Sequence, residues 1–371
     1  MKILMVSTIS NTINTFLVPH IQMLVNQGVQ VDVAFNEEQK VDIRLKELGC
    51  NIYIIKFNRS IFKNNFPSLI RDLRKIVIDG KYDVVHTHTP IASTIVRIAC
   101  KNIQNTDVYY TAHGFHFYKG SPALNWIIYY PIERFLSRFT DKLITINAED
   151  FHVSQKFNAK KNYLVRGVGI DLEKIGSANN NQLLLKNELN IPDESIILLS
   201  IGELNKNKNH KIVIEAISKL DKSDIHYVIC GVGKELENLK SLAKKLGLER
   251  QVHFLGFRKD ISEILNYTYV FVFPSFREGL SVSVMEAMAS GLPIIASDIR
   301  GNRDLVINGQ GGELFNPNDS EELSYKISKF YTDKFLRKKY GKFNLDRIKL
   351  FSLDEVLKDM KEIYFSDHVT K

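Results

Sequence analysis

Short apolar stretches rich in valine and isoleucine alternate along this chain with segments whose apolar residues recur every three or four positions. Many of the short stretches are apolar on both faces, as in KILMVST (2–8), VQVDVAF (29–35) and YDVVHTHT (82–89). Strands buried on both faces and separated by helices are typical of a parallel sheet with helical crossovers. The first half of the chain therefore predicts a doubly wound α/β domain, with further strands at 51–57, 108–114 and 142–147.

The same alternation begins again at SIILLSIGEL (195–204) and continues to LPIIASD (292–298). Between the two series, residues 165–182 are rich in glycine and asparagine, as a linker would be. A length of 371 residues suits about two domains. We therefore expect two Rossmann-like domains, at 1–168 and 169–350, and a final helix at 351–371 that crosses back to the first domain. The charged stretch from 323 to 363 is expected to be helical.

Composition narrows the class of protein only a little. The net charge of +8 favours anionic partners, but no nucleic-acid-binding signature accompanies it, so we expect no nucleic acid. No run approaches the roughly 20 apolar residues that span a bilayer, and the N-terminus reads as a core strand, which predicts a cytoplasmic protein. The three cysteines are far apart and are expected to be reduced core thiols.

The stretch FREGLSVSVMEAMASGLP (276–293) follows a predicted strand and opens a predicted helix. A helix N-terminus at the carboxyl end of a parallel strand suits a diphosphate. Glu278 in the turn and Glu286 on the helix would then accept hydrogen bonds from hydroxyls, for example those of a sugar and a ribose. The amides that would face the anion belong to Gly279, Leu280 and Ser281.

Two further loops follow strands of the second domain. GELNKNK (202–208) can place the ammonium groups of Lys206 and Lys208 on a phosphate. Gly231, in CGVGKE, indicates a close approach of backbone to a ligand. The first strand-to-helix turn of the chain contains no glycine, so the fingerprint of a dinucleotide-binding protein is absent there.

Histidines follow two strands of the first domain. His113, in TAHGFHFYKG, could hydrogen-bond a substrate hydroxyl or polarise a reacting centre. His86 and His88, joined by His113 and His116, could alternatively form the metal site of a hydrolase. The doubly wound rhythm disfavours that class, and no Asp-x-Asp occurs to hold a metal on a nucleotide-sugar, so we expect no metal.

Together these residues resemble the family 4 (group 1) retaining glycosyltransferases of the GT-B fold, in particular the capsular and exopolysaccharide type. The most specific element is the pair of glutamates eight residues apart, Glu278 and Glu286. The resemblance implies two Rossmann-like domains facing a central cleft, the first for the acceptor and the second for a UDP-sugar donor. It also implies that His113, Glu278 and Lys208 act in catalysis, and that the hinge lies near residues 167–171.

One position departs from the family pattern. Glu203 stands where an arginine is usual, which leaves neutralisation of the donor phosphates to Lys208, with Lys206 as a possible helper. The resemblance further implies a nucleobase pocket near residues 255–260, with Phe257 and Arg258 as contacts. A retaining transfer without a carboxylate nucleophile fits front-face attack, in which the leaving diphosphate accepts the proton of the incoming hydroxyl.

The expected acceptor is a saccharide linked to a polyprenyl diphosphate, and the expected product belongs to capsule or exopolysaccharide synthesis. Two segments that mix apolar and basic residues, 57–77 and 121–139, are candidates for peripheral contact with the anionic inner face of the plasma membrane. For the second segment, packing on its own sheet is the simpler expectation. Two alternatives stay open: a GT-B sugar-nucleotide epimerase, and a non-catalytic subunit that binds a nucleotide-sugar.

Overall fold

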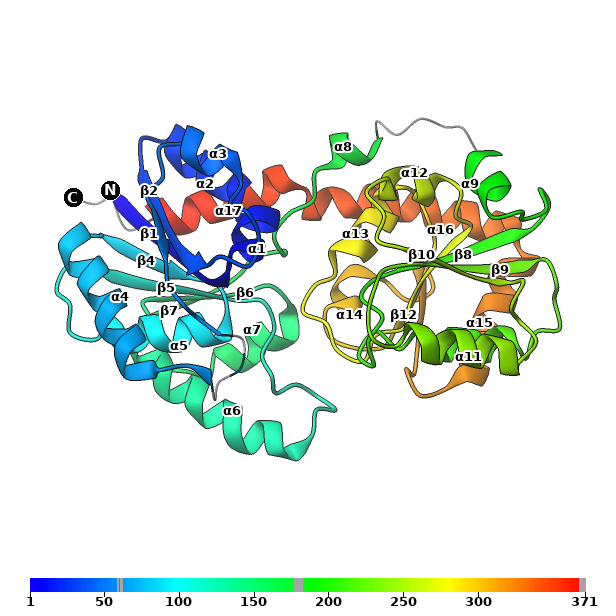
Figure 1. Cartoon of the computed structure of the whole chain (residues 1–371), viewed down its shortest axis with the longest axis horizontal. Helices are drawn as coiled ribbons and strands as arrows, with labels where there is room; N and C mark the ends of the chain where they lie inside the picture. The colour runs from blue at the N-terminus through cyan, green and yellow to red at the C-terminus, as the bar shows by residue number, and fades with distance from the viewer. Residues whose placement is uncertain (59, 61–62, 177–182, 367–371) are drawn as a thin grey trace. The chain divides into compact units, whose positions relative to one another are not determined.

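The computed structural model describes residues 1–58, 60, 63–176 and 183–366 (Figure 1). The chain divides into two compact units, Met1–Gly169 together with Asp354–Lys371, and Ile170–Leu353. The sequence placed this division after residue 168 and began the last segment at 351. The last helix starts at Leu353 and belongs almost wholly to the first unit.

A seven-stranded parallel sheet forms the centre of the first unit, in the order β3-β2-β1-β4-β5-β6-β7. The predicted strands are present. The edge strand β7 was missed, because KNYL is short and carries polar residues. The strands are β1 (Lys2–Ile9), β2 (Gln30–Asn36), β3 (Ile52–Ile54), β4 (Val84–Thr87), β5 (Asp107–Ala112), β6 (Lys142–Thr145) and β7 (Lys161–Leu164).

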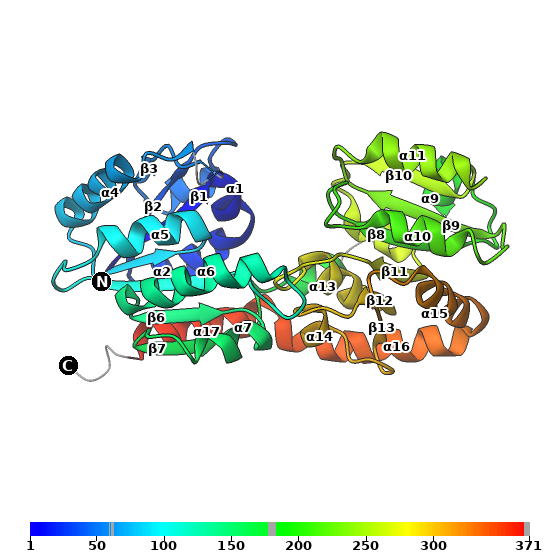
Figure 2. The ribbon, with the colours of Figure 1, turned by 90° about the horizontal axis from the view of Figure 1, so that it is seen from below.

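Helices cover both faces of this sheet. On one face, α2 (Val18–Asn26), α3 (Ile43–Glu47) and α17 (Leu353–Phe365) bury apolar side chains in one core with β1 and β2. On the other face, α5 (Pro90–Ala99) lies between α4 (Phe66–Gly80) and α6 (Ala123–Leu136), as Figure 2 shows. The remaining helical segments are α1 (Ser10–Thr12), the π-helix Ile13–Leu17, the 3-10 turn Ser137–Phe139 and α7 (Ala148–Ser154).

The second unit repeats this plan with six parallel strands in the order β10-β9-β8-β11-β12-β13. The edge strand β13 was also missed from the sequence. The strands are β8 (Ile196–Ile201), β9 (Ile225–Cys230), β10 (Val252–Gly256), β11 (Val270–Phe273), β12 (Ile294–Ser297) and β13 (Gly312–Phe315).

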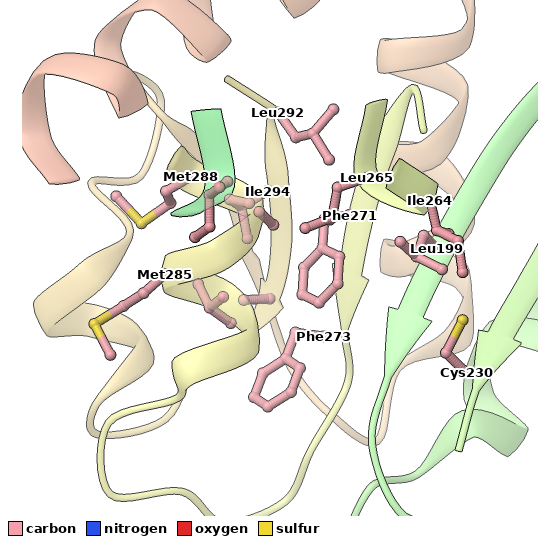
Figure 3. Packing of buried hydrophobic residues seen from close by; sticks show 14 of the residues in the cluster. Leu199, Cys230, Ile264, Leu265, Phe271, Phe273, Met285, Met288, Leu292 and Ile294 are labelled. Carbon is pink, nitrogen blue, oxygen red and sulfur yellow. The ribbon is translucent and has the colours of Figure 1, made fainter. Parts of the chain in front are cut away.

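Two hydrophobic clusters hold the helices of the second unit to its sheet. In one of them, Phe271 and Phe273 of β11 pack against Met285 and Met288 of α13 (Val282–Ala289), as Figure 3 shows. This packing fixes α13 directly behind the loop that contains Glu278, the first glutamate of the sequence pattern. The other helices are α8 (Leu172–Gly176), α9 (Leu183–Glu188), α10 (His210–Ile217), α11 (Leu236–Lys245), α12 (Ile261–Asn266), α14 (Asn302–Leu305), α15 (Ser320–Thr332) and α16 (Lys334–Arg347), followed by the 3-10 turn Ile348–Phe351.

The charged C-terminal stretch is helical, as predicted, but it is not one helix. α15 ends at Thr332, and Asp333 caps α16 by accepting a hydrogen bond from the amide of Leu336. Extended backbone at Ser352 then separates the end of the second unit from α17. Within the described residues, no helix is both long and apolar enough to span a membrane.

Candidate functional site

The candidate residues of the second unit gather where its strand order reverses. β8 and β11 are neighbours in the sheet, and their chains continue into helices in opposite directions along the strand order. Such a switch point leaves room between the two outgoing loops at the carboxyl edge of the sheet, which is the usual binding place in open α/β sheets. Lys208 follows β8 and Glu278 follows β11.

These two side chains form an ion pair. The Lys208 ammonium donates to Oε1 of Glu278 across 2.7 Å, and both side chains retain some exposure, 20% and 16%. The ammonium also lies 4.8 Å from the ring centroid of Phe273, the last residue of β11. An ion pair that is still accessible can exchange its partner for a ligand, so Lys208 can turn to a phosphate and Glu278 to a hydroxyl.

Asparagine side chains join the two loops that carry the ion pair. The amide of Phe276 donates to the carbonyl of Asn207 (2.8 Å), and the side chain of Asn207 donates to the carbonyl of Arg277 (3.0 Å). Asn209, which adopts a left-handed conformation at φ 53°, donates to the carbonyls of Pro274 and Pro317. Hydrogen bonds between the two loops therefore hold Lys208 and Glu278 in position, so their placement does not depend on the ion pair alone.

Helix α13 begins beside Glu278. Its N-cap is the buried Ser281, whose hydroxyl accepts from the amide of Val284, and Gly291 ends the helix with a left-handed φ of 70°. The start of the helix agrees with the sequence prediction. Gly279, Leu280 and Ser281 connect Glu278 of the ion pair to this N-terminal turn, and such a turn favours negative charge.

Glu286 lies on the first turns of α13 and is largely buried. Burial raises the pKa of its carboxyl from 4.5 to about 7, although the charge of Lys174 on α8 opposes the shift. At neutral pH this group is therefore present in both protonation states. A carboxyl of this kind becomes a better acceptor when a ligand supplies hydroxyl donors, which is the role that the sequence assigned to it.

Sequence reasoning missed one residue behind this site. Arg300, which follows β12 and is only 4% exposed, donates from Nε to the carbonyl of Glu278 across 3.1 Å. The next residue, Gly301, has φ 76°, and a Cβ built there would lie 1.9 Å from the carbonyl oxygen of Gly279. This loop supports the Glu278–Gly279 turn from behind. The signal was an Arg-Gly pair directly after a predicted strand.

In the first unit, a pocket opens at the corresponding edge of the sheet. Its volume is about 820 Å³. It is lined by Thr8 at the end of β1, Thr89 at the start of α5, Phe66 on α4, and Tyr129 and Ile132 on α6. The wall is largely apolar with a few hydroxyls, which suits a ligand that combines apolar and polar groups.

His113, which keeps some exposure, lies in a cluster with the buried His86 and His88. Its Nε2 is 3.4 Å from Nδ1 of His88, while His86 contacts Tyr364 of α17 through Nδ1 and Thr111 through Nε2. Burial lowers the pKa of His86 to about 3 and that of His113 to about 4, with neighbouring histidines adding to both shifts. The cluster is therefore neutral at physiological pH, around a small cavity of about 20 Å³.

The arrangement of these histidines differs from that of a metal site. Both ring nitrogens of His86 are already hydrogen-bonded, and His116 stacks on Tyr129 with ring centroids 4.7 Å apart. In the part of the chain that the structure describes, no three His, Cys, Asp or Glu side chains are grouped as a metal ion would require. The spacing of the histidines in the sequence reflects packing of β4 against β5.

Comparison with known proteins identifies the chain. Residues 181–346 match the family described as glycosyl transferases group 1, and residues 2–147 match the family described as glycosyl transferase 4-like. EpsD of Bacillus subtilis, named as a glycosyltransferase, is 34% identical over 98% of this chain and 96% of its own length. The chain is a group 1 glycosyltransferase.

Other relatives agree over nearly the full length. An Escherichia coli protein named UDP-Gal:alpha-D-GlcNAc-diphosphoundecaprenol alpha-1,3-galactosyltransferase is 28% identical over 95% of this chain and 98% of its own. HepE of Anabaena, solved in complex with UDP, superposes with a TM-score of 0.81 at 19% identity, covering 99% of this chain and all of that one. The fold of this glycosyltransferase is therefore GT-B, as the resemblance implied, and the epimerase alternative is set aside.

The other predicted donor contacts of this glycosyltransferase are less closely grouped. Lys206 is exposed and does not join the ion pair. Glu203 is also exposed, and it stands in place of the family's arginine without pairing with Lys208. A Cβ built on Gly231 would lie 1.9 Å from the carbonyl of Gly202, so the close approach at this glycine is to the neighbouring loop. Its role toward a ligand stays a prediction.

The two residues proposed for the nucleobase have different surroundings. Phe257 is 73% exposed, so its ring is available for stacking on a base. Arg258 forms ion pairs with Glu188 (2.7 Å) and Asp260 (2.5 Å), which raise the pKa of its guanidinium and join α9 to α12. Arg258 therefore already has a structural role, and a contact with the donor would have to be made in addition to it.

Proposed function

We propose that this glycosyltransferase transfers a hexose or N-acetylhexosamine from a UDP-sugar to a saccharide carried on a polyprenyl diphosphate, with retention of configuration at the anomeric carbon. The observation that carries the proposal is the accessible Lys208–Glu278 ion pair at the switch point of the second unit, beside the N-terminus of α13. It combines a cation for a diphosphate with a carboxylate for sugar hydroxyls.

The donor fits this site group by group. Lys208 neutralises the diphosphate together with the N-terminal turn of α13. Released from Lys208, Glu278 accepts hydrogen bonds from the sugar hydroxyls, and Glu286 accepts those of the ribose. Support for uridine comes from the UDP in the HepE structure and from the UDP-Gal in the name of the E. coli relative.

In the proposed transfer, the bond between the anomeric carbon and the diphosphate oxygen breaks while the acceptor oxygen approaches from the same face. The proton of the acceptor hydroxyl passes to the departing diphosphate oxygen, so no protein base is needed. The enzyme stabilises the negative charge that develops on the diphosphate, chiefly through Lys208. We expect this cation to replace a metal ion, so full transfer in excess EDTA is the predicted result.

The acceptor is proposed to enter the pocket of the first unit. The hydroxyls of Thr8, Thr12 and Thr89 can bond a saccharide, while Phe66 and Ile132 provide apolar wall. Two relatives are named as acting on sugars joined to undecaprenol through diphosphate, the E. coli protein above and a Campylobacter jejuni N-acetylgalactosaminyltransferase that is 27% identical over 91% of both chains.

The exposed apolar face of helix α6 suits contact with a membrane. The simpler expectation, that this segment packs on its own sheet, is wrong for most of its large apolar side chains: Leu124 is 62% exposed, Ile127 70% and Phe135 54%. Trp126 is exposed beside them, and Arg134 lies in the last turn. An aromatic and aliphatic face ending in basic residues is typical of helices that rest on an anionic bilayer. We therefore propose a peripheral enzyme at the cytoplasmic face of the plasma membrane, in capsule or exopolysaccharide synthesis.

Transfer assays test the proposed function. The purified enzyme is supplied with each of a panel of UDP-sugars and GDP-sugars, with and without polyprenyl-diphosphate-linked monosaccharides, and product configuration is read by NMR. We expect one UDP-sugar to give a product with retained configuration, together with slow donor hydrolysis when the acceptor is omitted. Inverted product would contradict the mechanism. Binding of UDP without transfer or hydrolysis of any donor would favour a non-catalytic subunit instead.

A further inference from the structure

The histidine cluster of the first unit contains a pair that shares one hydrogen bond. His88, which follows β4 and is 4% exposed, points its Nδ1 at Nε2 of His113, which follows β5, and the two nitrogens are 3.4 Å apart. The ring centroids are 5.6 Å apart with an interplanar angle of 33°. His113 is partly exposed, so its other nitrogen, Nδ1, is the one that a ligand can reach.

Both rings are neutral, which restricts where their protons can be. Burial lowers the pKa of His88 well below its usual value, with His86 and His113 adding to the shift, and the pKa of His113 falls to about 4. A neutral imidazole carries one N–H and one bare nitrogen. The shared bond therefore allows two joint states, with the proton of the bond on Nδ1 of His88 or on Nε2 of His113.

The far side of His88 distinguishes these states. Its Nε2 is buried and has no hydrogen-bond partner among the described residues. If His113 donated the shared bond, His88 would carry its own proton on this Nε2, and a buried N–H would be left without an acceptor. Orphaned buried N–H groups are rarer than acceptors with an unused lone pair. The arrangement therefore favours donation by His88 from Nδ1.

We propose that His88 is a positioning residue for His113: it donates its Nδ1–H to Nε2 of His113 and thereby holds the His113 proton on Nδ1, facing the ligand. His113 then acts as a hydrogen-bond donor to a sugar or phosphate oxygen and not as a general base. This last step rests on the proposed function, in which the leaving diphosphate takes the acceptor proton and leaves no deprotonation for His113 to perform.

The cluster also supplies a matched control. Tyr364 on α17 contacts Nδ1 of His86, and His86 reaches β5 at Thr111, so this half of the cluster does not include the bond between His88 and His113. Tyr364→Phe removes the hydroxyl that contacts His86, a histidine as buried as His88, and leaves the His88–His113 bond in place. Asparagine at position 88 keeps an amide N–H near the position of the imidazole Nδ1, whereas leucine at 88 removes the donor and keeps the apolar volume.

Nitrogen NMR of the ¹⁵N-histidine-labelled full chain at pH 7.5 reads the tautomer directly, with the His113 signals assigned from their absence in His113→Gln. We expect protonated Nδ1 and bare Nε2 in the wild type, in Tyr364→Phe and in His88→Asn, and a shift toward protonated Nε2 in His88→Leu. Free imidazole side chains favour a proton on Nε2, so the expected pattern is distinctive. Protonated Nε2 of His113 in the wild-type spectrum overturns the proposal whether or not the variants at position 88 fold.

Activity supplies the second readout. His88→Leu is expected to lower kcat for transfer by about 10- to 100-fold with the Kd for UDP unchanged, because the His113 ring then presents its bare nitrogen to the ligand in place of its N–H. His88→Asn should retain most of the rate. An unchanged kcat in folded His88→Leu overturns the positioning role. Absence of transfer from every donor in the wild type, with the tautomer as expected, contradicts the proposed function and leaves the assignment of the His88–His113 proton standing.

Discussion

The two units of this glycosyltransferase have the same strand order around their first strand, β3-β2-β1-β4 in one and β10-β9-β8-β11 in the other, yet the chemistry at their switch points differs. In the second unit the outgoing loops carry an ammonium and a carboxylate, Lys208 and Glu278, that stay partly exposed. In the first unit the corresponding loops carry the buried His88 and the partly exposed His113, both neutral, and a largely apolar pocket opens at this edge of the sheet. The same strand order therefore presents an accessible ion pair in one unit and a largely apolar pocket in the other.

The difference comes from burial as much as from residue type. Lys208 and Glu278 keep contact with water, so each can exchange its partner in the ion pair for a ligand at little cost in free energy. His86 and His88 are enclosed by the sheet and α17, so a charge on either would be poorly solvated. We therefore expect substitutions in the second unit to change how well the charge of the donor diphosphate is neutralised. Substitutions in the first unit should change the orientation of side chains and the binding of the acceptor.

The largest effect is expected from loss of the Lys208 charge. Lys208→Met should lower kcat/KM for transfer by about 100- to 1,000-fold, because the charge that develops on the diphosphate loses its main cation. Steady-state kinetics with the preferred UDP-sugar measures it. Lys206→Met, two residues away on the exposed side of the same loop, is the matched control and should stay within about threefold of the wild type.

A smaller effect is expected from Glu278→Gln, which keeps the shape of the side chain but weakens its bonds to sugar hydroxyls. We expect transfer to fall by about 10- to 100-fold while UDP, which has no sugar to bond, binds as well as before or better. Kinetics measures the loss of transfer, and calorimetry on the same preparations measures the affinity for UDP. If UDP affinity fell in parallel with transfer, Glu278 would serve the phosphates or the loop and not the sugar. Glu203→Gln is the exposed control.

Glu286 makes donor binding depend on pH. Since burial raises its pKa to about 7 and the ribose needs the carboxylate, affinity for the UDP-sugar should rise about tenfold between pH 6 and pH 8, and Glu286→Gln should remove the dependence. The diphosphate of a UDP-sugar does not itself titrate in this range. A pH-independent Kd in the wild type would place the ribose elsewhere.

The same residue affects stability with a definite sign. The folded protein keeps a proton on Glu286 up to a pH of about 7, whereas the unfolded chain releases it near 4.5, so the group destabilises the fold as pH rises between these values. Glu286→Gln should therefore raise the free energy of unfolding by about 1–2 kcal/mol at pH 8 and have no such effect at pH 4. Urea melts at the two pH values make the comparison.

The smallest change is expected at the surface of the first unit. The emission of Trp126, the single tryptophan of the chain, should shift to shorter wavelength when vesicles containing phosphatidylglycerol are added, and less with phosphatidylcholine alone. Ile127→Asp should weaken vesicle binding several-fold, whereas Phe335→Asp, at a still more exposed position on α16 of the second unit, should not. Binding that survives Ile127→Asp unchanged would mean that α6 is not the contact.

Much of the fold and part of the site could be read from the sequence. Buried strands such as VFVF of β11 are apolar on both faces, and the glutamate pair marks the loop and helix that follow. The edge strands β7 and β13 were missed because they are short and their pattern is weak. Arg300 and the His88–His113 bond were missed because both depend on contacts between different strands, which no local pattern encodes.

Helix α6 shows where periodicity alone fails. Its apolar residues were expected to pack on the sheet, but Ile127 and Phe135 are exposed, while Arg97 of α5 and Glu133 of α6 form the buried contact between the helices at 2.8 Å. The mixture of apolar and basic residues in the sequence did not indicate which side of this helix faces the core. Only the packing of α6 against α5 shows that this apolar face is exposed.

Calorimetric titration of UDP into the wild type, Lys208→Met and His88→Leu tests the division between the two units most directly. We expect UDP to bind the wild type and His88→Leu with the same affinity, and Lys208→Met at least 10-fold more weakly, because the diphosphate is held by the charge at the β8–β11 switch point. Equal affinity in all three proteins would contradict the assignment of the donor diphosphate to Lys208.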